Sequence, residues 1–165
     1  YEQQYPWQYL QVEYATDTAA AGEFRGAPAL HYRRRMLDPV KAIVYNQGWR
    51  HPMQGYLGGA SGAGNYFVLN QGAPDELTVT DCCFDVPIGA GNFIFAQSGA
   101  GGGWGDPLKR LPARVLDDVR DGYVSINGAK QNYGVVIDGA AMTIDHHATT
   151  LLRAKLGAPA EKSVA

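Results

Sequence analysis

Two side chains in this sequence have the chemistry and the local setting for proton transfer. His51 lies between Arg50 and Pro52 in the turn-like segment WRHPMQG, and Asp106 follows a run of glycines. Histidine titrates near neutral pH, and a carboxylate is a common alternative acid or base, so both are candidate catalytic residues. The favoured interpretation is structural for each: a turn residue for His51 and a helix N-cap for Asp106. The alternative places His51 beside a substrate channel.

Two adjacent pairs, His146–His147 and Cys82–Cys83, invite a metal or redox interpretation that their spacing argues against. Neighbouring side chains on a helix point about 100° apart, whereas zinc sites use spaced ligands. Adjacent cysteines rarely pair and lack Cys-x-x-Cys spacing. We therefore predict no metal and no cofactor in this chain, a solvent- or interface-facing histidine pair, and two buried free thiols. Free thiols indicate a reducing compartment, which we expect to be the cytoplasm.

The stretch QSGAGGGWGDP, residues 97–107, contains a dense glycine run that does not match a nucleotide-binding motif. A Walker A loop requires Gly-Lys, and this pair is absent from the sequence. A dinucleotide fingerprint requires glycine at relative positions one, three and six, and the sixth position after Gly99 or Gly101 is not glycine. Trp104 and Pro107 do not suit a flexible linker. We therefore predict a shaped turn in which Trp104 covers closely packed glycines and Pro107 starts a helix. The residues of this structural turn are Gly99, Gly101, Gly102, Gly103, Trp104, Gly105, Asp106 and Pro107.

Residues 1–106 are predicted to be rich in β-structure, because short apolar or alternating runs are separated by turn residues at regular intervals. This spacing is typical of an antiparallel sheet in a sandwich or barrel. The runs Ala42–Tyr45, Tyr66–Leu69 and Phe93–Ala96 have few polar positions, as strands buried on both faces do. The expected strands are Tyr9–Ala15, Ala29–Leu37, Lys41–Trp49, Asn65–Asn70, Leu77–Thr80, Phe84–Val86 and Asn92–Gln97.

Three consecutive arginines lie in the second expected strand. Because side chains alternate along a strand, Arg34 belongs to one face and Arg33 and Arg35 to the other. A solvated strand face or a subunit interface is the favoured interpretation, and an anion contact is the alternative.

Residues 107–158 are predicted to be mainly helical. The first helix follows Pro107, has leucines and valines at helical spacing, and ends before Gly122. A second helix begins after Ser125 as N-cap and ends near Tyr133, before Gly134. A strand at residues 135–137 and a third helix capped by residue 145 complete the pattern. The apolar face of the third helix is expected to contain Ala148, Leu151, Leu152 and Leu156.

The sequence therefore predicts an α+β, mainly β fold: an antiparallel sandwich- or barrel-like sheet followed by two or three short helices. We expect a single domain over residues 1–165, with a frayed tail at 159–165. The 45% hydrophobic and 18% charged residues fit a folded chain, and a net charge of −2 gives no electrostatic case for nucleic acid or an anionic membrane. The sequence does not begin with methionine, so we expect a processed or partial chain.

Several longer stretches resemble the C-terminal part of the hydantoinase B family, also called the oxoprolinase B family. GAGGGWGDPLKRLPARVLDDVRDGYVSINGAKQNYGVVID resembles the family's glycine-rich turn, its DVRDG-like turn and its helix ending in YGVV. YATDTAAAGEFRGAPALHYRRRML, RHPMQGYLGGASGAGNYFVLNQG and DHHATTLLRAKLGA are similar to further family segments. Two departures are DCCFDVPIGAG before the glycine run and the histidines at 146 and 147. The resemblance covers nearly the whole chain, but only about the last third of the family's usual length, downstream of the family's expected metal-binding region.

The resemblance implies a small subunit or C-terminal portion of a hydantoinase B-type component. The implied enzyme is an ATP-dependent ketone carboxylase of the acetone or acetophenone type, or a cyclic-amide hydrolase of the hydantoinase or 5-oxoprolinase type. The implied partners are larger hydantoinase B-type and hydantoinase A-type subunits, with ATP and a divalent metal bound by the partners. We expect this chain to contribute structure and interface and not to be catalytic alone, with its N-terminal segment YEQQYPWQY laid on a partner as an arm. A stand-alone binding or scaffolding module is the alternative, and the substrate stays open.

Overall fold

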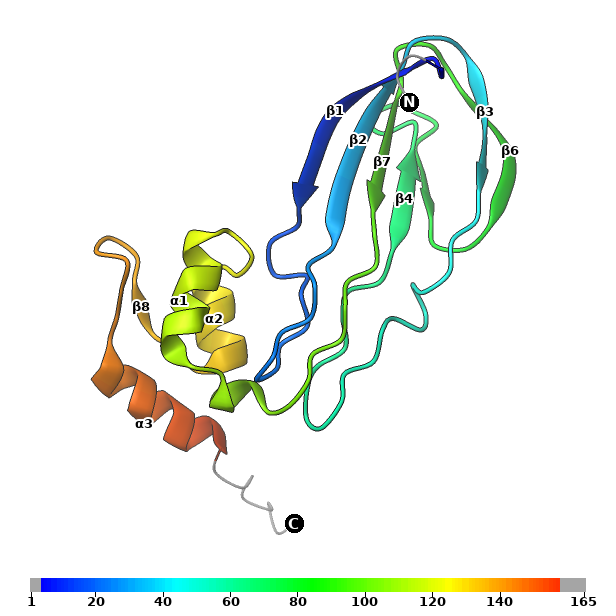
Figure 1. The fold of residues 1–165 in the computed structure, drawn as a ribbon. Helices are drawn as coiled ribbons and strands as arrows, with labels where there is room; N and C mark the ends of the chain where they lie inside the picture. The colour runs from blue at the N-terminus through cyan, green and yellow to red at the C-terminus, as the bar shows by residue number, and fades with distance from the viewer. Residues whose placement is uncertain (1–3, 158–165) are drawn as a thin grey trace.

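The computed structural model describes residues 4–157, which form a β-rich part and a helical part joined by extended glycine-rich segments (Figure 1). The order of elements confirms the predicted mainly β fold followed by short helices. The strands of the β-rich part are β1 (Trp7–Tyr14), β2 (Leu30–Met36), β3 (Val40–Val44), β4 (Tyr66–Leu69), β5 (Leu77–Val79), β6 (Cys83–Ile88) and β7 (Phe93–Gln97). The helical part contains the 3-10 turn η1 (Pro107–Lys109), α1 (Pro112–Arg120), α2 (Ile126–Tyr133), β8 (Ile137–Asp138), β9 (Thr143–Ile144) and α3 (His146–Gly157).

The β-rich part has two layers. Five strands form an antiparallel sheet in the order β1-β2-β7-β4-β5, and the antiparallel pair β3–β6 packs over one face of it. The sheet does not close, so the structure is sandwich-like and the barrel alternative is excluded. The expectation that β3 is buried on both faces is wrong, because Ile43 is 57% exposed on the outer side of the thin second layer. The residues buried between the layers are Met36, Val44, Leu69, Val79 and Ile88.

Two of the N-terminal aromatic residues, Trp7 and Tyr9, belong to the sheet. Trp7 and Tyr9 lie in β1 and pair with Met36 and Arg34 of β2. The Tyr5 ring stacks on Trp7 with 4.7 Å between ring centroids. The expectation of an N-terminal arm laid on a partner is wrong in part, because residues 7–9 belong to β1 of the chain's own sheet. Residues 1–3 of the expected arm lie outside the described residues, and a contact of this segment with a partner stays a prediction.

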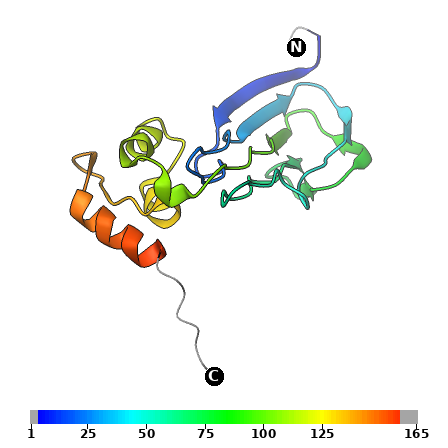
Figure 2. The same cartoon turned by 60° about the horizontal axis from the view of Figure 1, so that its bottom comes forward.

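Three extended segments, residues 18–28, 53–64 and 99–105, connect the sheet to the helices and are called here the glycine bundle. In Figures 1 and 2 these segments run together between the two parts of the molecule. Backbone hydrogen bonds join them: Ala60 N–H donates to the Ala21 carbonyl at 2.8 Å, and Gly103 N–H donates to the Ala60 carbonyl at 2.9 Å. Glycine permits this spacing, since a Cβ on Gly103 would lie 2.1 Å from the Ala21 oxygen. The bundle is therefore held by backbone contacts, with little room for side chains.

The predicted first helix is divided into η1 and α1. Pro112 lacks a backbone N–H and disfavours helical backbone in the residue before it, and Leu111 is extended with φ −57° and ψ 127°. The expected continuous helix after Pro107 is therefore wrong. Gly122 follows α1 with φ +78°, as a C-terminal glycine does.

The other predicted helix caps are confirmed. The Ser125 hydroxyl accepts a hydrogen bond from Gly128 N–H, and Gly134 ends α2 in the left-handed conformation. Asp145 accepts from Ala148 N–H at the start of α3. The expected apolar face of α3 is wrong in part: Leu151 is 59% exposed, because α3 docks through the buried Thr149 instead. The predicted tail at 159–165 lies outside the described residues.

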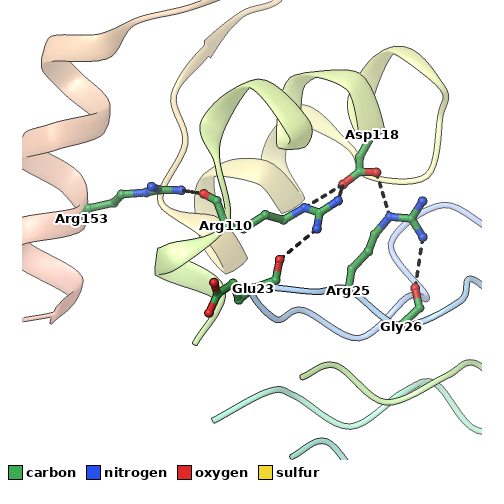
Figure 3. Close-up of polar contacts among 6 residues, drawn as sticks. All are labelled: Glu23, Arg25, Gly26, Arg110, Asp118 and Arg153. Atoms are coloured by element: carbon green, nitrogen blue, oxygen red, sulfur yellow. Dashed lines mark hydrogen bonds and ion pairs between the residues drawn. The ribbon is translucent and has the colours of Figure 1, made fainter. Parts of the chain in front are cut away.

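A buried ion-pair network fastens the helical part to the glycine bundle (Figure 3). The Asp118 carboxylate of α1 accepts from Arg110 Nη2 at 2.8 Å and from Arg25 Nε at 2.8 Å. Arg110 also donates to the Glu23 carbonyl, so one carboxylate and two guanidinium groups link α1 to residues 23–26. Arg153 extends the network to α3 by donating to the Arg110 carbonyl. These contacts hold the orientation of the two parts.

Candidate functional site

A cleft of about 880 Å³ opens where the sheet meets the glycine bundle. One wall is the loop from Gln47 to Gln54, and the other is the start of the glycine run at Gly99 to Gly101. Its size falls within the range of about 300–1,000 Å³ that small-molecule sites occupy. We take this cleft as the candidate functional site.

Hydrogen bonds from Asn46 fix the base of the loop. Asn46 is 2% exposed, and its amide nitrogen donates to the carbonyls of Asn65 at 2.9 Å and Thr80 at 2.8 Å. The Asn65 amide nitrogen donates back to Asn46 Oδ1. Farther along the loop, the Trp49 ring meets Tyr66 of β4 edge to face, with 5.6 Å between centroids. The loop is thereby attached to β4 and to the end of β5.

His51 is exposed and lines the cleft together with the loop. Among residues 4–157 no hydrogen bond or ion pair engages its imidazole, whereas its neighbour Arg50 pairs with Asp81 at 2.9 Å. His51 is therefore a candidate proton donor or acceptor for a molecule bound in the cleft.

Neutral amide groups give the cleft its polarity. Gln54 is held by its donation to the Pro52 carbonyl and by acceptance from the Ser61 hydroxyl. Asn65 Oδ1 is buried and, within the described part of the chain, has no hydrogen-bond donor. A buried acceptor without a donor is costly, and Asn65 is among the residues that line the cleft. Gln47 adds another amide at the cleft, whose described lining contains no carboxylate. The lining therefore suits a neutral, hydrogen-bonding molecule.

The glycines of the run differ in how much space surrounds them. A Cβ on Gly102 would lie 2.1 Å from the Gln54 carbonyl oxygen, whereas a Cβ on Gly99 would meet no atom within 4 Å. Gly102 is therefore required by close packing, and Gly99 borders the open cleft.

Trp104 is 44% exposed and its ring packs against Phe24, with 5.4 Å between centroids, beside the bundle.

The structure does not bring the two candidate catalytic residues together. The Asp106 carboxylate caps η1 by accepting a hydrogen bond from Leu108 N–H at 2.9 Å, and Pro107 occupies the first position of that turn. Asp106 is not among the residues that line the cleft containing His51. Its carboxylate therefore has the geometry of the predicted N-cap.

The histidine and cysteine pairs lie on the surface. His146 and His147 are exposed in the first turn of α3. Cys82 is exposed and Cys83 is half-buried, so the expectation of two buried thiols is wrong for Cys82, which lies in the turn before β6. Within residues 4–157, no group of three or more His, Cys, Asp or Glu side chains is placed to hold a metal ion. No helix in that range is long and apolar enough to cross a membrane.

The amide residues of the cleft carry little signal in the sequence that marks them as functional. Asn46, Gln54 and Asn65 neither titrate nor follow a motif, so a search for catalytic residue types passes over them. The one available signal was position: Asn46 and Asn65 each border an apolar run that was expected to form a strand.

Comparisons with known proteins point to one family. A model of the family described as hydantoinase B/oxoprolinase matches residues 1–107 of this chain. The beta subunit of a caprolactamase from Pseudomonas jessenii is 36% identical over 163 residues, which cover 93% of this chain and 27% of that subunit. The chain thus spans about a quarter of the length of this relative.

Two solved structures are similar to this chain in fold. The crystal structure of the ATP-dependent caprolactamase from Pseudomonas jessenii matches with a TM-score of 0.79 and 30% identity, over 93% of this chain and 27% of that chain. The nucleotide-free structure of an acetone carboxylase matches with a TM-score of 0.69 and 23% identity, over 92% of this chain and 25% of that chain, a level that establishes the shared fold alone.

Proposed function

The chain belongs to the hydantoinase B/oxoprolinase family, and on this basis we propose that it forms part of a hydantoinase B-type component of an ATP-dependent cyclic-amide hydrolase. In this proposal it supplies scaffold, subunit interface and one wall of the substrate cleft. Larger hydantoinase B-type and hydantoinase A-type subunits complete the enzyme and bind ATP and the divalent metal.

The likeness to the caprolactamase over 93% of the chain carries this proposal. The likeness in sequence and in fold extends through the cleft, the glycine bundle and the helices. The acetone carboxylase match supports a shared fold, so the ketone carboxylase is the less favoured of the two activities.

The chemistry of the cleft agrees with a cyclic amide as substrate. A lactam is uncharged and carries one N–H donor and one carbonyl acceptor. The side-chain amides of Gln47, Gln54 and Asn65 line the cleft, and the amide of Gln47 offers N–H donors. In this proposal the lactam carbonyl accepts from the Gln47 amide, and the uncharged ring meets no carboxylate in the described lining. In this proposal His51, which lines the same cleft, exchanges a proton with the bound amide.

The test uses the complete protein assembled with its partner subunits. ADP formation is measured with ATP plus a lactam such as caprolactam, and separately with ATP, bicarbonate and acetone. Lactam-dependent ADP formation is expected, accompanied by the ring-opened amino acid. ADP formation that depends only on acetone and bicarbonate would favour the carboxylase. A homogeneous monomer near 17.8 kDa without partners would contradict the proposal and favour a stand-alone binding module.

Gly99 offers a variant that reports on the cleft itself. Gly99→Leu adds a side chain where a Cβ meets no neighbouring atom, so the fold is expected to survive while the cleft narrows. The expected result is a raised KM for the lactam with an unchanged unfolding midpoint. Gly99→Ala is the matched control and should change KM much less.

A further inference from the structure

Three aromatic side chains form a row across the end of the glycine bundle next to η1. Trp104 forms an antiparallel bridge with Phe24 and a parallel bridge with Tyr56. Residues opposite each other in such bridges direct their side chains to the same face. The exposed fractions are 52% for Phe24, 44% for Trp104 and 67% for Tyr56. We call this row the aromatic ladder.

Leu57 continues the apolar surface from a strained turn. Its φ is +50° and that of Gly58 is +93°, and Gly59 N–H closes the turn on the Tyr56 carbonyl at 3.0 Å. A branched side chain rarely adopts the left-handed region, and strained positions cluster at functional sites. The Leu57 side chain is also 61% exposed. The positive φ costs stability, and a side chain this exposed gains little by burial within the chain, so a role in stability does not account for this leucine.

Cationic side chains flank the other side of the ladder. Lys109 and Arg114 are exposed and line a hollow of about 290 Å³ with Phe24 and Leu111, which is 63% exposed. Among residues 4–157, neither cation takes part in an ion pair. Glu23 also lines the hollow, and its negative charge offsets one of the two cations. Lys109, Arg114 and Glu23 together therefore carry a net charge of +1. The rim is therefore complementary to an acidic partner.

We infer that the aromatic ladder, Leu57 and the rim of Lys109 and Arg114 form a docking surface for another protein subunit. The matching surface of that subunit would present apolar side chains flanked by carboxylates. Aromatic residues and arginine are enriched at interface hot spots, and large exposed apolar patches mark interaction sites. The overall charge of −2 argues against nucleic acid on this surface. The inference rests on the proposed function, since it assigns the surface to assembly of that enzyme.

The decisive variant is Leu57→Gly. Glycine relieves the strain at a positive φ and removes the anchor, so two readouts should move in opposite directions. In the separated protein, the thermal unfolding midpoint should rise. In the complete protein with its partner subunits, native mass spectrometry should show a dissociation constant raised by at least about tenfold. If Leu57 had only a structural role, its replacement would not raise the unfolding midpoint and weaken assembly at the same time.

Two further variants bear on the surface. Leu151→Ala removes a leucine of 59% exposure on α3 and should leave assembly unchanged. The double variant Lys109→Glu with Arg114→Glu should weaken assembly, and the loss should be larger at low salt. A photo-crosslinking amino acid at Tyr56 should link to a peptide of a partner subunit that contains Asp or Glu.

Three other outcomes would contradict the docking surface or its assigned partner. Normal assembly of the Leu57 and charge-reversal variants would overturn the docking surface and leave the proposed function standing. Crosslinking of Tyr56 to a second copy of this chain would replace the partner subunit by self-association. A monomeric wild-type protein would overturn both the surface and the proposed function.

Discussion

Gly102 and Gln54 are in direct backbone contact: a Cβ added to Gly102 would lie 2.1 Å from the Gln54 carbonyl oxygen. The next glycine of the same run, Gly103, packs equally closely against a different segment: a Cβ added to Gly103 would lie 2.1 Å from the Ala21 carbonyl oxygen. Close packing of backbones, and not phosphate binding, explains the glycines at these two positions. The same contact links the glycine run to the loop that forms the wall of the cleft.

This contact gives the first prediction. Gly102→Ala forces one backbone segment away from another, and we expect it to lower the free energy of unfolding by about 3 kcal/mol. Gly99→Ala, three residues earlier, should change it by less than about 1 kcal/mol, because its Cβ meets nothing within 4 Å. Urea unfolding of both variants makes the comparison. Equal costs at the two positions would show that the bundle does not pack as described.

The second prediction concerns the network that joins α1 to the bundle. Asp118→Ala leaves Arg110 and Arg25 without their buried carboxylate and should cost about 3–5 kcal/mol of stability. Asp117→Ala is the matched control, since its pair with Arg120 is exposed and 3.7 Å long, and should cost about 0–1 kcal/mol. Thermal unfolding measures the stability of both variants. An equal loss of stability in Asp117→Ala and Asp118→Ala would contradict the role of Asp118 in joining α1 to the bundle.

The third prediction follows from Tyr133, which is 1% exposed and whose hydroxyl has no hydrogen-bond partner among the described residues. Burial raises the pKa of Tyr133 above its ordinary value of 10.0, partly offset by nearby Arg110. The folded protein therefore holds this proton more tightly than the unfolded chain. Its contribution to stability is complete below pH 10 and is lost as the pH rises from 10 through the raised pKa.

Tyr133→Phe removes the ionisable group without breaking a hydrogen bond within the described chain. At pH 7 the free energy of unfolding should stay unchanged or rise by about 1 kcal/mol. Above pH 10 the variant should lose less stability than the wild type, by up to about 1.4 kcal/mol per pH unit. Tyr45→Phe, at a position that is 74% exposed, is the control and should keep the wild-type alkaline profile. Urea unfolding across pH 7 to about 11 provides the measurement.

The fourth prediction tests His51 in the assembled enzyme. If its imidazole transfers a proton to or from the bound amide, His51→Gln should lower kcat by about 100-fold or more. The unfolding midpoint should not change, because the imidazole has no partner in the described structure. His147→Gln on α3 should leave kcat unaltered. An unchanged kcat in His51→Gln would exclude proton transfer by His51 and favour its structural role as a turn residue.

Local features of this protein were determined by the sequence. The β-rich half, the caps at Ser125 and Asp145, and the end of α2 at Gly134 followed from turn chemistry and periodicity, because these preferences act within a few residues. Pro112 also carried a local signal, and the division of the helix there could have been predicted from its missing N–H.

Tertiary structure alone decided which residues meet across long separations. Asp118 contacts Arg25, 93 residues away, and Asn65 borders the same cleft as His51 and Gly99, although no periodicity relates these positions. Exposure was also a tertiary outcome: Ile43 and Leu151 have the apolar character of core residues, yet the elements that carry them are covered on the opposite side. Sequence preferences act over a few residues, whereas an ion pair, a cleft and an exposed leucine depend on how distant segments pack.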